Sequence, residues 1–245
     1  MIFSLFKKRK TEGGIVRPKV DLHSHLIPGI DDGAKSMEES LLMLEALEAL
    51  GYEKVITTPH IMIDAYRNTK QSILEGLLEL RSEAAKKDLK IQIDAAAEYY
   101  LDEGLLPLIE KGEVLLAGGE YLLFETSYTH RSMQFEQMVF EILSAGYKPL
   151  LAHPERYRYI QNHREEYSRL KELGIFFQLN LNSLLGYYGQ SAKKAAEFLC
   201  QEGMVDFLGS DAHNLNQISS LTMAFQTESY AKLWSHNTIL NERLR

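Results

Sequence analysis

Residues 20–25 of this chain read Val-Asp-Leu-His-Ser-His, a short extended run that ends in two histidines. Residues two apart in a strand point to the same face, so His23 and His25 can bind one ion together. For an isolated pair of this kind, two ordinary surface histidines are the more common explanation. The pair becomes informative because similar runs recur along the chain, and six of the seven end in a residue of a metal-binding type.

The recurring runs alternate with amphipathic helices, of which the first is the clearest, because Ser36 and Glu39 match a capping box and Gly51 ends the pattern. Alternation of this kind implies parallel strands joined by right-handed crossovers. The expected architecture is therefore α/β, a closed or nearly closed β/α barrel, with an open doubly wound sheet as the alternative. Strands are predicted at residues 20–23, 55–58, 91–97, 121–124, 149–152, 176–179 and 205–208. Helices are predicted at residues 36–50, 69–87, 103–111, 134–145, 164–173, 191–202 and 219–233.

The composition is that of a globular protein of 245 residues with a formal net charge of -7. An acidic chain is a poor general nucleic-acid binder, because phosphate contacts need a basic surface. We therefore expect no nucleic-acid partner. A single cysteine, Cys200, excludes an internal disulfide and any site built from several cysteines. A cytoplasmic location is the simplest expectation.

Residues 1–18 differ from the rest and are expected to form a flexible basic leader and linker before a single domain at residues 19–245. The apolar residues 1–6 are too few for a membrane span, which needs about 20. The basic run at residues 7–10 comes after them, the reverse of a signal peptide. Plain disorder is one reading of the leader. The other is weak contact of residues 1–10 with anionic lipid at the inner face of the cytoplasmic membrane.

Polar side chains stand where the predicted strands end, and in a β/α barrel these carboxyl ends share the face that carries active sites. Glu98 and Glu125 follow apolar runs, where an unpaired carboxylate carries a desolvation cost and calls for a cation. The histidines and carboxylates together exceed what one ion needs, so two or three divalent ions that share bridging carboxylates are expected. The side chains concerned are His23, His25, His60, Glu98, Glu125, His153, Asp211 and His213.

These residues form motifs that resemble those of the polymerase and histidinol phosphatase (PHP) superfamily. The motifs, in chain order, are His23-Ser24-His25, Thr58-Pro59-His60, Glu98, His153-Pro154-Glu155-Arg156 and Ser210-Asp211-Ala212-His213. The longer string His-Leu-Ile-Pro-Gly-Ile-Asp-Asp-Gly-Ala at residues 25–34 narrows the resemblance. It is similar to the bacterial manganese-dependent protein-tyrosine phosphatases of capsule and exopolysaccharide gene clusters. The resemblance covers about residues 20–215.

The resemblance implies a distorted (β/α)7, TIM-like barrel of the PHP type with a trinuclear metal centre at the carboxyl ends of the strands. Manganese is the expected metal, with iron, zinc or magnesium as alternatives. By matching positions, the first ion is held by His23, His25, Glu98 and Asp211. The second is held by Glu98, Glu125 and His153, and the third by Asp32, His60 and His213.

The implied activity is that of a metal-dependent protein-tyrosine phosphatase, a phosphoric monoester hydrolase. His60 and Asp211 are expected in catalysis together with Arg156, whose planar guanidinium matches a phosphate. The alternative for Arg156 is a surface salt bridge with Glu155 or Glu165.

A second phosphate-binding arginine is missing from its usual place, because residues 214–218 contain none. Arg67 or Arg158 is the expected substitute in substrate binding.

The implied partner is the phosphorylated, tyrosine-rich tail of a bacterial tyrosine autokinase that controls capsular or exopolysaccharide synthesis. Two alternatives remain open at this stage. One is a small-molecule phosphomonoesterase, such as an enzyme acting on histidinol phosphate, and the other is a non-catalytic scaffold stabilised by metals. The oligomeric state does not follow from the sequence.

Overall fold

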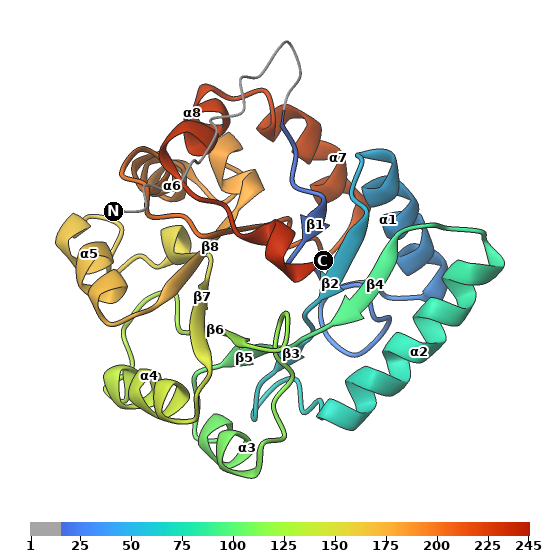
Figure 1. Ribbon diagram of the computed structural model, residues 1–245, viewed down its shortest axis with the longest axis horizontal. Helices are drawn as coiled ribbons and strands as arrows, with labels where there is room; N and C mark the ends of the chain where they lie inside the picture. The colour runs from blue at the N-terminus through green and yellow to red at the C-terminus, as the bar shows by residue number, and fades with distance from the viewer. Residues whose placement is uncertain (1–15) are drawn as a thin grey trace, which may run out of the picture.

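The computed structural model describes residues 16–245, so the predicted leader and its membrane contact through residues 1–10 fall outside the described residues, apart from residues 16–18. Within that range, parallel strands lie at the centre and helices surround them (Figure 1). The strands are β1 (Val20–Asp21), β2 (Lys54–Thr57), β3 (His60–Ile61), β4 (Gln92–Ala95), β5 (Glu98–Tyr100), β6 (Tyr121–Glu125), β7 (Lys148–Ala152), β8 (Phe176–Asn180) and β9 (Phe207–Gly209). The α-helices are α1 (Met37–Ala49), α2 (Lys70–Lys86), α3 (Leu105–Lys111), α4 (Phe135–Ser144), α5 (Arg164–Glu172), α6 (Gln190–Gln201), α7 (Leu215–Ala224) and α8 (Glu228–His236). Short 3₁₀ helices are η1 (Pro154–Arg156), η2 (Leu181–Leu185) and η3 (Asn241–Leu244).

Along residues 16–245, no helix has the length and apolar content that spanning a bilayer requires.

Two of the predicted strands, at residues 55–58 and 91–97, are each followed by a short strand that was not predicted, β3 and β5, because the chain bends there and passes from one sheet to the other. The sheet orders are β1-β2-β4 and β3-β5-β6-β7-β8-β9. The first bend falls at Pro59, which has no N–H to offer to a sheet ladder, and the second falls at residues 96–97, between β4 and β5. Hydrogen bonds continue across both bends: Ala96 N donates to Thr57 O at 2.9 Å, and Glu98 N donates to Pro59 O at 3.1 Å.

The first and last strands meet and close the curled sheet beyond their carboxyl ends. Ser24 and Ala212 form a parallel bridge. Beside it, Asp211 N donates to His23 O at 2.7 Å, and His25 N donates to Ala212 O at 3.0 Å. The predicted fold, a distorted α/β barrel, is confirmed. The closure also brings the first and last sequence motifs side by side.

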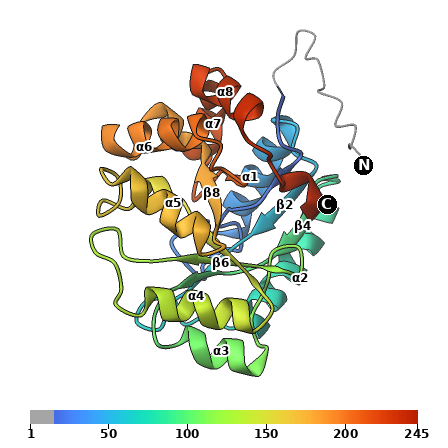
Figure 2. The same ribbon diagram turned by 60° about the vertical axis from the view of Figure 1, so that its left-hand side comes forward.

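The interior of the barrel is apolar, and the C-terminal segment covers its amino end. Figure 1 shows the C-terminus in the middle of the ring, close to β1, and Figure 2 shows the same segment after a turn of the molecule. Asn241 on η3 donates to Val20 O at 2.9 Å and Leu208 O at 2.7 Å, and accepts from Leu208 N at 2.9 Å. The buried side chains of this interior cluster are Val20, Leu22, Ile56, Ala96, Ala117, Tyr121, Leu123, Leu150, Ala152, Phe207, Leu240 and Leu244.

Two local predictions were wrong in detail. The single helix predicted at residues 219–233 is two helices, α7 and α8, because Thr227 caps a new helix by accepting from Tyr230 N. At α1, Ser36 accepts from Glu39 N as expected, but the Glu39 carboxylate accepts from Lys35 N, so the capping box is only half formed.

Candidate metal centre

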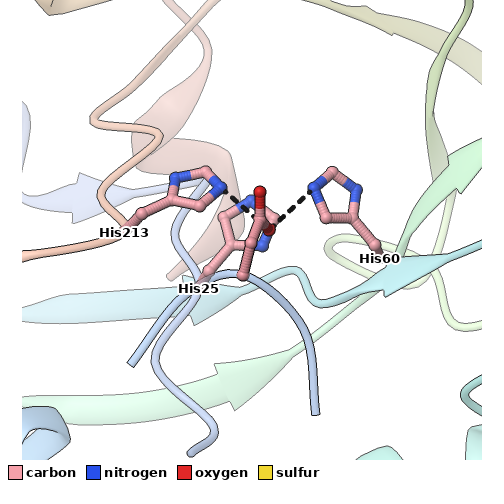
Figure 3. A group of neighbouring side chains, drawn as sticks. His25, His60 and His213 are labelled. Carbon is pink, nitrogen blue, oxygen red and sulfur yellow. Dashed lines mark ion pairs between the residues drawn. The ribbon is translucent and has the colours of Figure 1, made fainter. Parts of the chain in front are cut away.

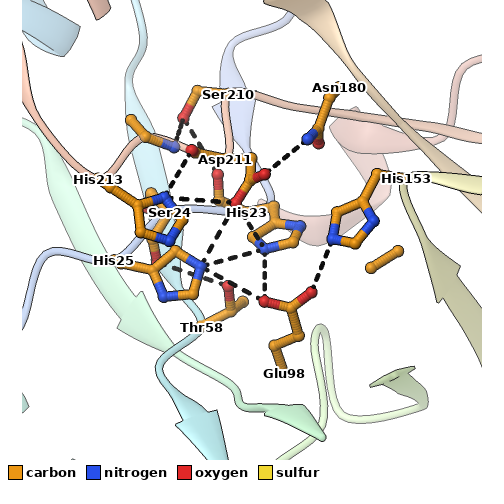
Figure 4. A network of polar contacts seen from close by, with 12 residues as sticks. His23, Ser24, His25, Thr58, Glu98, His153, Asn180, Ser210, Asp211 and His213 are labelled. Atoms are coloured by element: carbon orange, nitrogen blue, oxygen red, sulfur yellow. Dashed lines mark hydrogen bonds and ion pairs between the residues drawn. The ribbon is translucent and has the colours of Figure 1, made fainter. Parts of the chain in front are cut away.

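The side chains predicted as metal ligands lie together at the carboxyl end of the barrel. Figure 4 shows those of His23, His25, Glu98, His153, Asp211 and His213. They form overlapping groups in which the possible ligand atoms all lie within 4.8 Å of one another. The groups are His23, His25, Glu98 and Asp211; His25, Asp32, His60 and His213; and His60, Glu98 and Glu125. His153 joins them through Glu98, since its Nε2 lies 3.0 Å from Glu98 Oε1.

The first group is fully inside the protein and has the composition predicted for the first ion. His23 Nε2 lies 3.0 Å from Glu98 Oε2 and 3.3 Å from Asp211 Oδ1. His25 Nε2 lies 3.4 Å and 3.5 Å from the same two atoms. All four side chains are buried, so the two imidazoles and two carboxylates face one small volume that a cation fits.

The second group surrounds the carboxylate pair of Glu98 and Glu125. The prediction named His153 as its histidine, and His153 Nε2 also lies 3.9 Å from Glu125 Oε2. His60 approaches the same pair from another side, with its Nδ1 3.3 Å from Glu98 Oε2 and 3.4 Å from Glu125 Oε1. Two histidines therefore face this pair of carboxylates.

The third group lies at the opening of the centre to solvent. Asp32 Oδ1 is 3.4 Å from both His60 Nε2 and His213 Nε2, and Figure 3 shows these rings with His25 around that carboxylate. The rings of His25 and His213 stack at 4.0 Å between centroids. The Asp32 side chain is 51% exposed, so one side of the centre is accessible from outside.

A divalent cation fits this donor set. His60 Nδ1 is buried and makes no hydrogen bond to any described residue, although it faces Glu98 and Glu125. A cation between the three side chains would satisfy this nitrogen and both carboxylates at once. Imidazole and carboxylate donors suit first-row divalent ions such as manganese, iron and zinc.

The charges of the centre also call for cations. Burial, and then the nearby Glu98 carboxylate, raise the pKa of Glu125 to about 8. Burial opposes protonation of His23, but Glu98 and Asp211 raise the pKa of its imidazole to about 9. Burial and the Arg156 guanidinium lower the pKa of His153 to about 4, which keeps that imidazole neutral, the form that ligates metals. Cations bound at these carboxylates would take the place of protons, so metal binding would release protons.

Two candidate ligands have a left-handed backbone. His153 has φ 35° and Asp211 has φ 49°, and among residues 16–245 only Asp88 is another non-glycine residue with positive φ. Such conformations carry a local cost and cluster at functional sites. Both residues stand directly beyond strand ends, where the left-handed turn accompanies a change in chain direction.

Asp31, which was not predicted as a site residue, accepts hydrogen bonds from His25 and His60 on the side away from the metal centre. His25 Nδ1 donates to Asp31 Oδ2 at 2.8 Å, which leaves His25 Nε2 to face the centre. The same carboxylate accepts from Gly33 N and His60 N. A Cβ on Gly33 would lie 2.3 Å from His25 O, so glycine is needed for this close approach. The Asp-Asp-Gly string therefore carries the candidate ligand Asp32 and also positions His25.

Two buried amides on β8 join the first and last motifs. His23 Nδ1 donates to Gln178 Oε1 at 2.7 Å, Gln178 Nε2 donates to Asn180 Oδ1 at 2.9 Å, and Asn180 Nδ2 donates to Asp211 Oδ2 at 2.6 Å. The relay fixes the His23 tautomer with Nε2 toward the centre. A Cβ on Gly209 would lie 2.6 Å from His23 Cβ and 2.7 Å from Gln178 Nε2, so glycine makes room for the relay. Polar residues two apart in the otherwise apolar β8 were the signal for it.

Arg156 lies against the metal centre. Its Nη1 donates to Asp211 Oδ2 at 2.8 Å, and its guanidinium lies over the rings of Tyr128 and Tyr188, 4.7 Å and 4.2 Å from their centroids. The alternative, a surface salt bridge with Glu155 or Glu165, is not what the structure shows. Glu155 is buried and accepts from Ser183 and from Asn180 N, and Glu165 lies near His163.

The two substitute arginines lie outside the three groups. The Arg67 side chain is exposed, and its Nε donates to Ile63 O at 2.9 Å. Arg158 is exposed as well, and its backbone N donates to Tyr128 O. Neither guanidinium contacts a candidate ligand among the described residues, so their role in substrate binding stays a prediction.

The family model described as capsular polysaccharide synthesis, CpsB/CapC, matches residues 19–227. The chain belongs to the CpsB/CapC family. This match covers all nine candidate ligands and Arg156, whereas α8 and the η3 segment that closes the barrel lie beyond it. The resemblance drawn from the motifs is confirmed.

Similar proteins in the CpsB/CapC group carry phosphatase names. Tyrosine-protein phosphatase YwqE of Bacillus subtilis is 29% identical over 197 residues, which cover 80% of this chain and 78% of YwqE. Tyrosine-protein phosphatase CpsB of Streptococcus pneumoniae is 30% identical over 203 residues, which cover 80% of this chain and 84% of CpsB. A chain from the crystal structures of YwqE and CpsB, described as metal-dependent tyrosine phosphatases, superposes with a TM-score of 0.79. It is 26% identical and covers 90% of this chain and 96% of its own length.

Proposed function

We propose that this chain is a metal-dependent protein-tyrosine phosphatase that takes part in the control of capsular or exopolysaccharide synthesis. The observation that carries the proposal is the convergence of imidazoles and carboxylates from separate strands on one end of the barrel, with Arg156 beside them. The phosphatase names of YwqE and CpsB, and the metal dependence stated for both, support it.

The chain's own residues would divide the work between holding ions and holding phosphate. His23, His25, Glu98 and Asp211 would hold one ion; Glu98, Glu125 and His153 would hold a second; and Asp32, His60 and His213 would hold a third. Bound divalent ions supply an activated water near neutral pH and stabilise charge on the phosphoryl oxygens. We propose manganese as the physiological metal, with iron, zinc and magnesium as the competitors to be tested.

Arg156 is the proposed phosphate-binding side chain. Tyr128 and Tyr188 hold its guanidinium between their rings, and the ion pair with Asp211 sets its orientation. Asp211 uses Oδ2 for Arg156 and Asn180, which leaves Oδ1 facing His23 and His25. A guanidinium fixed in this way can donate two parallel hydrogen bonds to a phosphate without losing much side-chain freedom on binding.

An exposed substrate, rather than a small metabolite, suits this opening. The third group reaches the surface through Asp32, and the side chains of His60 and His213 are 12% and 19% exposed. A phosphotyrosine projects far enough from a polypeptide to reach such a site. The proposed substrate is the phosphorylated, tyrosine-rich tail of a tyrosine autokinase in the same polysaccharide system.

We also propose that the protein works in the cytoplasm, held weakly at the inner face of the membrane by residues 1–10. The basic residues at 7–10 would each add about 1 kcal/mol on anionic lipid, which supports reversible, salt-sensitive binding. Sedimentation with anionic vesicles, comparing the full chain with one that starts at Gly14, tests this point. Equal partitioning at low salt would contradict it.

Phosphate release tests the main proposal. Chelated protein is given manganese, iron, zinc or magnesium in turn, and its turnover of a phosphotyrosine peptide is compared with its turnover of histidinol phosphate. We expect the highest kcat/KM with manganese and the peptide. A preference for histidinol phosphate would favour the small-molecule phosphatase instead, and no turnover with any metal would favour a non-catalytic scaffold.

A further inference from the structure

A cavity of about 280 Å³ lies beside the metal centre, between the segment that follows β3 and the start of α3. Aliphatic and aromatic side chains make most of its wall, among them Ile61, Ile63, Tyr66, Tyr100 and Leu105. Ile63 is a large apolar side chain that is 38% exposed. The proposed function gives this cavity no role.

The cavity adjoins the metal centre through Tyr66. The Tyr66 ring stacks on the His60 ring, with 5.3 Å between centroids and 14° between planes, and Tyr66 also lines the cavity. Asn68 Nδ2 donates to both His60 O and Ile30 O at 2.9 Å, which fixes the segment that carries Tyr66. The ring of Tyr66 therefore lies between His60 and the cavity, so a chain bound at His60 has the cavity next to it.

Two charged side chains, Asp102 and Arg67, lie at the edge of the cavity, and of these Arg67 is available to bind a ligand. Asp102 is committed to the backbone, because its carboxylate accepts from Ile63 N and Gly104 N, each at 2.9 Å. Arg67 uses Nε for Ile63 O, and no carboxylate among residues 16–245 forms an ion pair with its guanidinium. An apolar cavity with an unpaired cation at its edge is complementary to an apolar group that has a carboxylate beside it.

The size of the cavity also limits its occupant. Pockets for whole small molecules usually begin at about 300 Å³, so this cavity suits a single large side chain. An extended chain advances about 3.3 Å per residue. Because Tyr66 both stacks on His60 and lines the cavity, the occupant is expected within about three residues of the phosphotyrosine, a span of roughly 10 Å in an extended chain.

We propose that this cavity is a specificity subsite that receives an apolar side chain of the phosphoprotein substrate, while Arg67 binds an acidic residue next to it. The inference rests on the proposed phosphotyrosine activity and adds a preference for sequence around the phosphorylated residue. It also gives Arg67 a different task from the second phosphate contact expected from the sequence.

Two phosphotyrosine peptides of equal length test the subsite in the manganese-loaded, full-length protein. One carries leucine and glutamate two and three residues from the phosphotyrosine on both sides, and the other carries serine there. One apolar group in a pocket is worth roughly 10- to 200-fold in kcat/KM. We expect a ratio of at least about tenfold in favour of the first peptide, carried mainly by KM.

Two variants connect that ratio to the cavity. Gly104 lines it and has an ordinary φ of −75°. A Cβ there would lie 3.1 Å from Asp102 Oδ1, which must shift by a few tenths of an ångström, and 3.7 Å from the Ile63 side chain, so Gly104→Leu should fill the space. Arg67→Glu reverses the charge at the edge. Both variants should bring the ratio of kcat/KM for the two peptides toward one. Lys194→Glu makes the same charge change at an exposed position of α6 and should leave that ratio as in the parent protein.

The outcomes separate this inference from the proposed function. Hydrolysis of both peptides at equal kcat/KM by the parent protein would overturn the subsite and leave the phosphatase activity standing. A parent ratio that neither variant lowers would place the preference elsewhere and also overturn it. No hydrolysis of either peptide with any metal would overturn the proposed function itself. If Gly104→Leu does not fold, Arg67→Glu decides.

Discussion

The two ends of the barrel are built from the same strands but from opposite kinds of side chains. Toward the amino end, strand residues such as Val20, Leu123 and Phe207 fill an apolar interior. A few positions further along the same strands, the carboxyl end collects buried imidazoles and carboxylates such as His23 and Glu98. Apolar burial supplies folding free energy, whereas buried charges cost free energy unless they are paired. Stability and chemistry are thus separated along each strand, as is usual for β/α barrels.

Of the changes considered, metal removal should have the largest effect on activity, and it should leave the apolar amino end of the barrel folded. Chelation with EDTA should lower turnover of a phosphotyrosine peptide by more than about a thousandfold, because both the attacking water and the charge compensation depend on the ions. The far-ultraviolet circular dichroism should keep its shape, because the apolar interior does not depend on metal.

Cys200→Ser is the control for that experiment. Burial raises the pKa of the Cys200 thiol, and the residue lies on α6 outside the three ligand groups. The variant should keep near-normal turnover and the same sensitivity to EDTA. Activity that resists EDTA but is lost with thiol reagents would point to cysteine chemistry and contradict the metal mechanism.

Arg156→Ala should lower kcat/KM without lowering the metal content of the protein. Loss of one preorganised contact to the phosphoryl group costs about 2–3 kcal/mol, or roughly 30- to 150-fold in kcat/KM. The kcat/KM of Arg156→Lys should fall between those of the parent and Arg156→Ala, because lysine keeps the positive charge but lacks the planar guanidinium that donates two parallel hydrogen bonds. Metal content, measured on the same samples, should stay at the parent value, and unchanged kinetics would remove Arg156 from phosphate binding.

Gln178→Ala should show whether the relay on β8 matters for the ligands it orients. Removal of an outer hydrogen-bond partner of a ligating histidine typically lowers metal affinity about 10- to 100-fold. Nitrogen chemical shifts of His23 should show loss of the fixed Nδ1–H tautomer. Gln92→Ala, at an exposed position of β4, is the matched control. Equal metal affinity in both variants would make the relay a packing feature only.

Asn241→Ala should lower the stability of the fold at the amino end of the barrel and have the smallest effect on kcat/KM. The substitution leaves Val20 O, Leu208 O and Leu208 N without their partners, which should cost about 3 kcal/mol of unfolding free energy. For a domain of this size, the melting temperature should fall by roughly 6–12 °C. Below the transition, kcat/KM should match the parent, and a large loss of kcat there would contradict the separation of the two ends.

Local pattern was enough for much of this protein. Short apolar runs located the strands, which are buried on both faces. Helical spacing located most of the helices, because the burial of one helix face leaves its period in the sequence. Residue chemistry at the strand ends, together with the resemblance of the motifs, indicated the candidate ligands and Arg156. The parallel strands required by the β/α alternation placed these residues at one end of the barrel.

Only the tertiary structure decided how those parts meet. The bends at Pro59 and at residues 96–97 carry the chain from one sheet to the other, and Thr227 starts a new helix where one continuous helix was predicted. His60 faces two ligand groups through its two ring nitrogens, and Arg156 pairs with Asp211, which lies 55 positions away in the chain. Contacts of this kind join segments far apart in the sequence, so no local pattern records them. The sequence by itself determined which chemistry each strand end carries, and the closure of the barrel determined which of those side chains lie close enough to face one another.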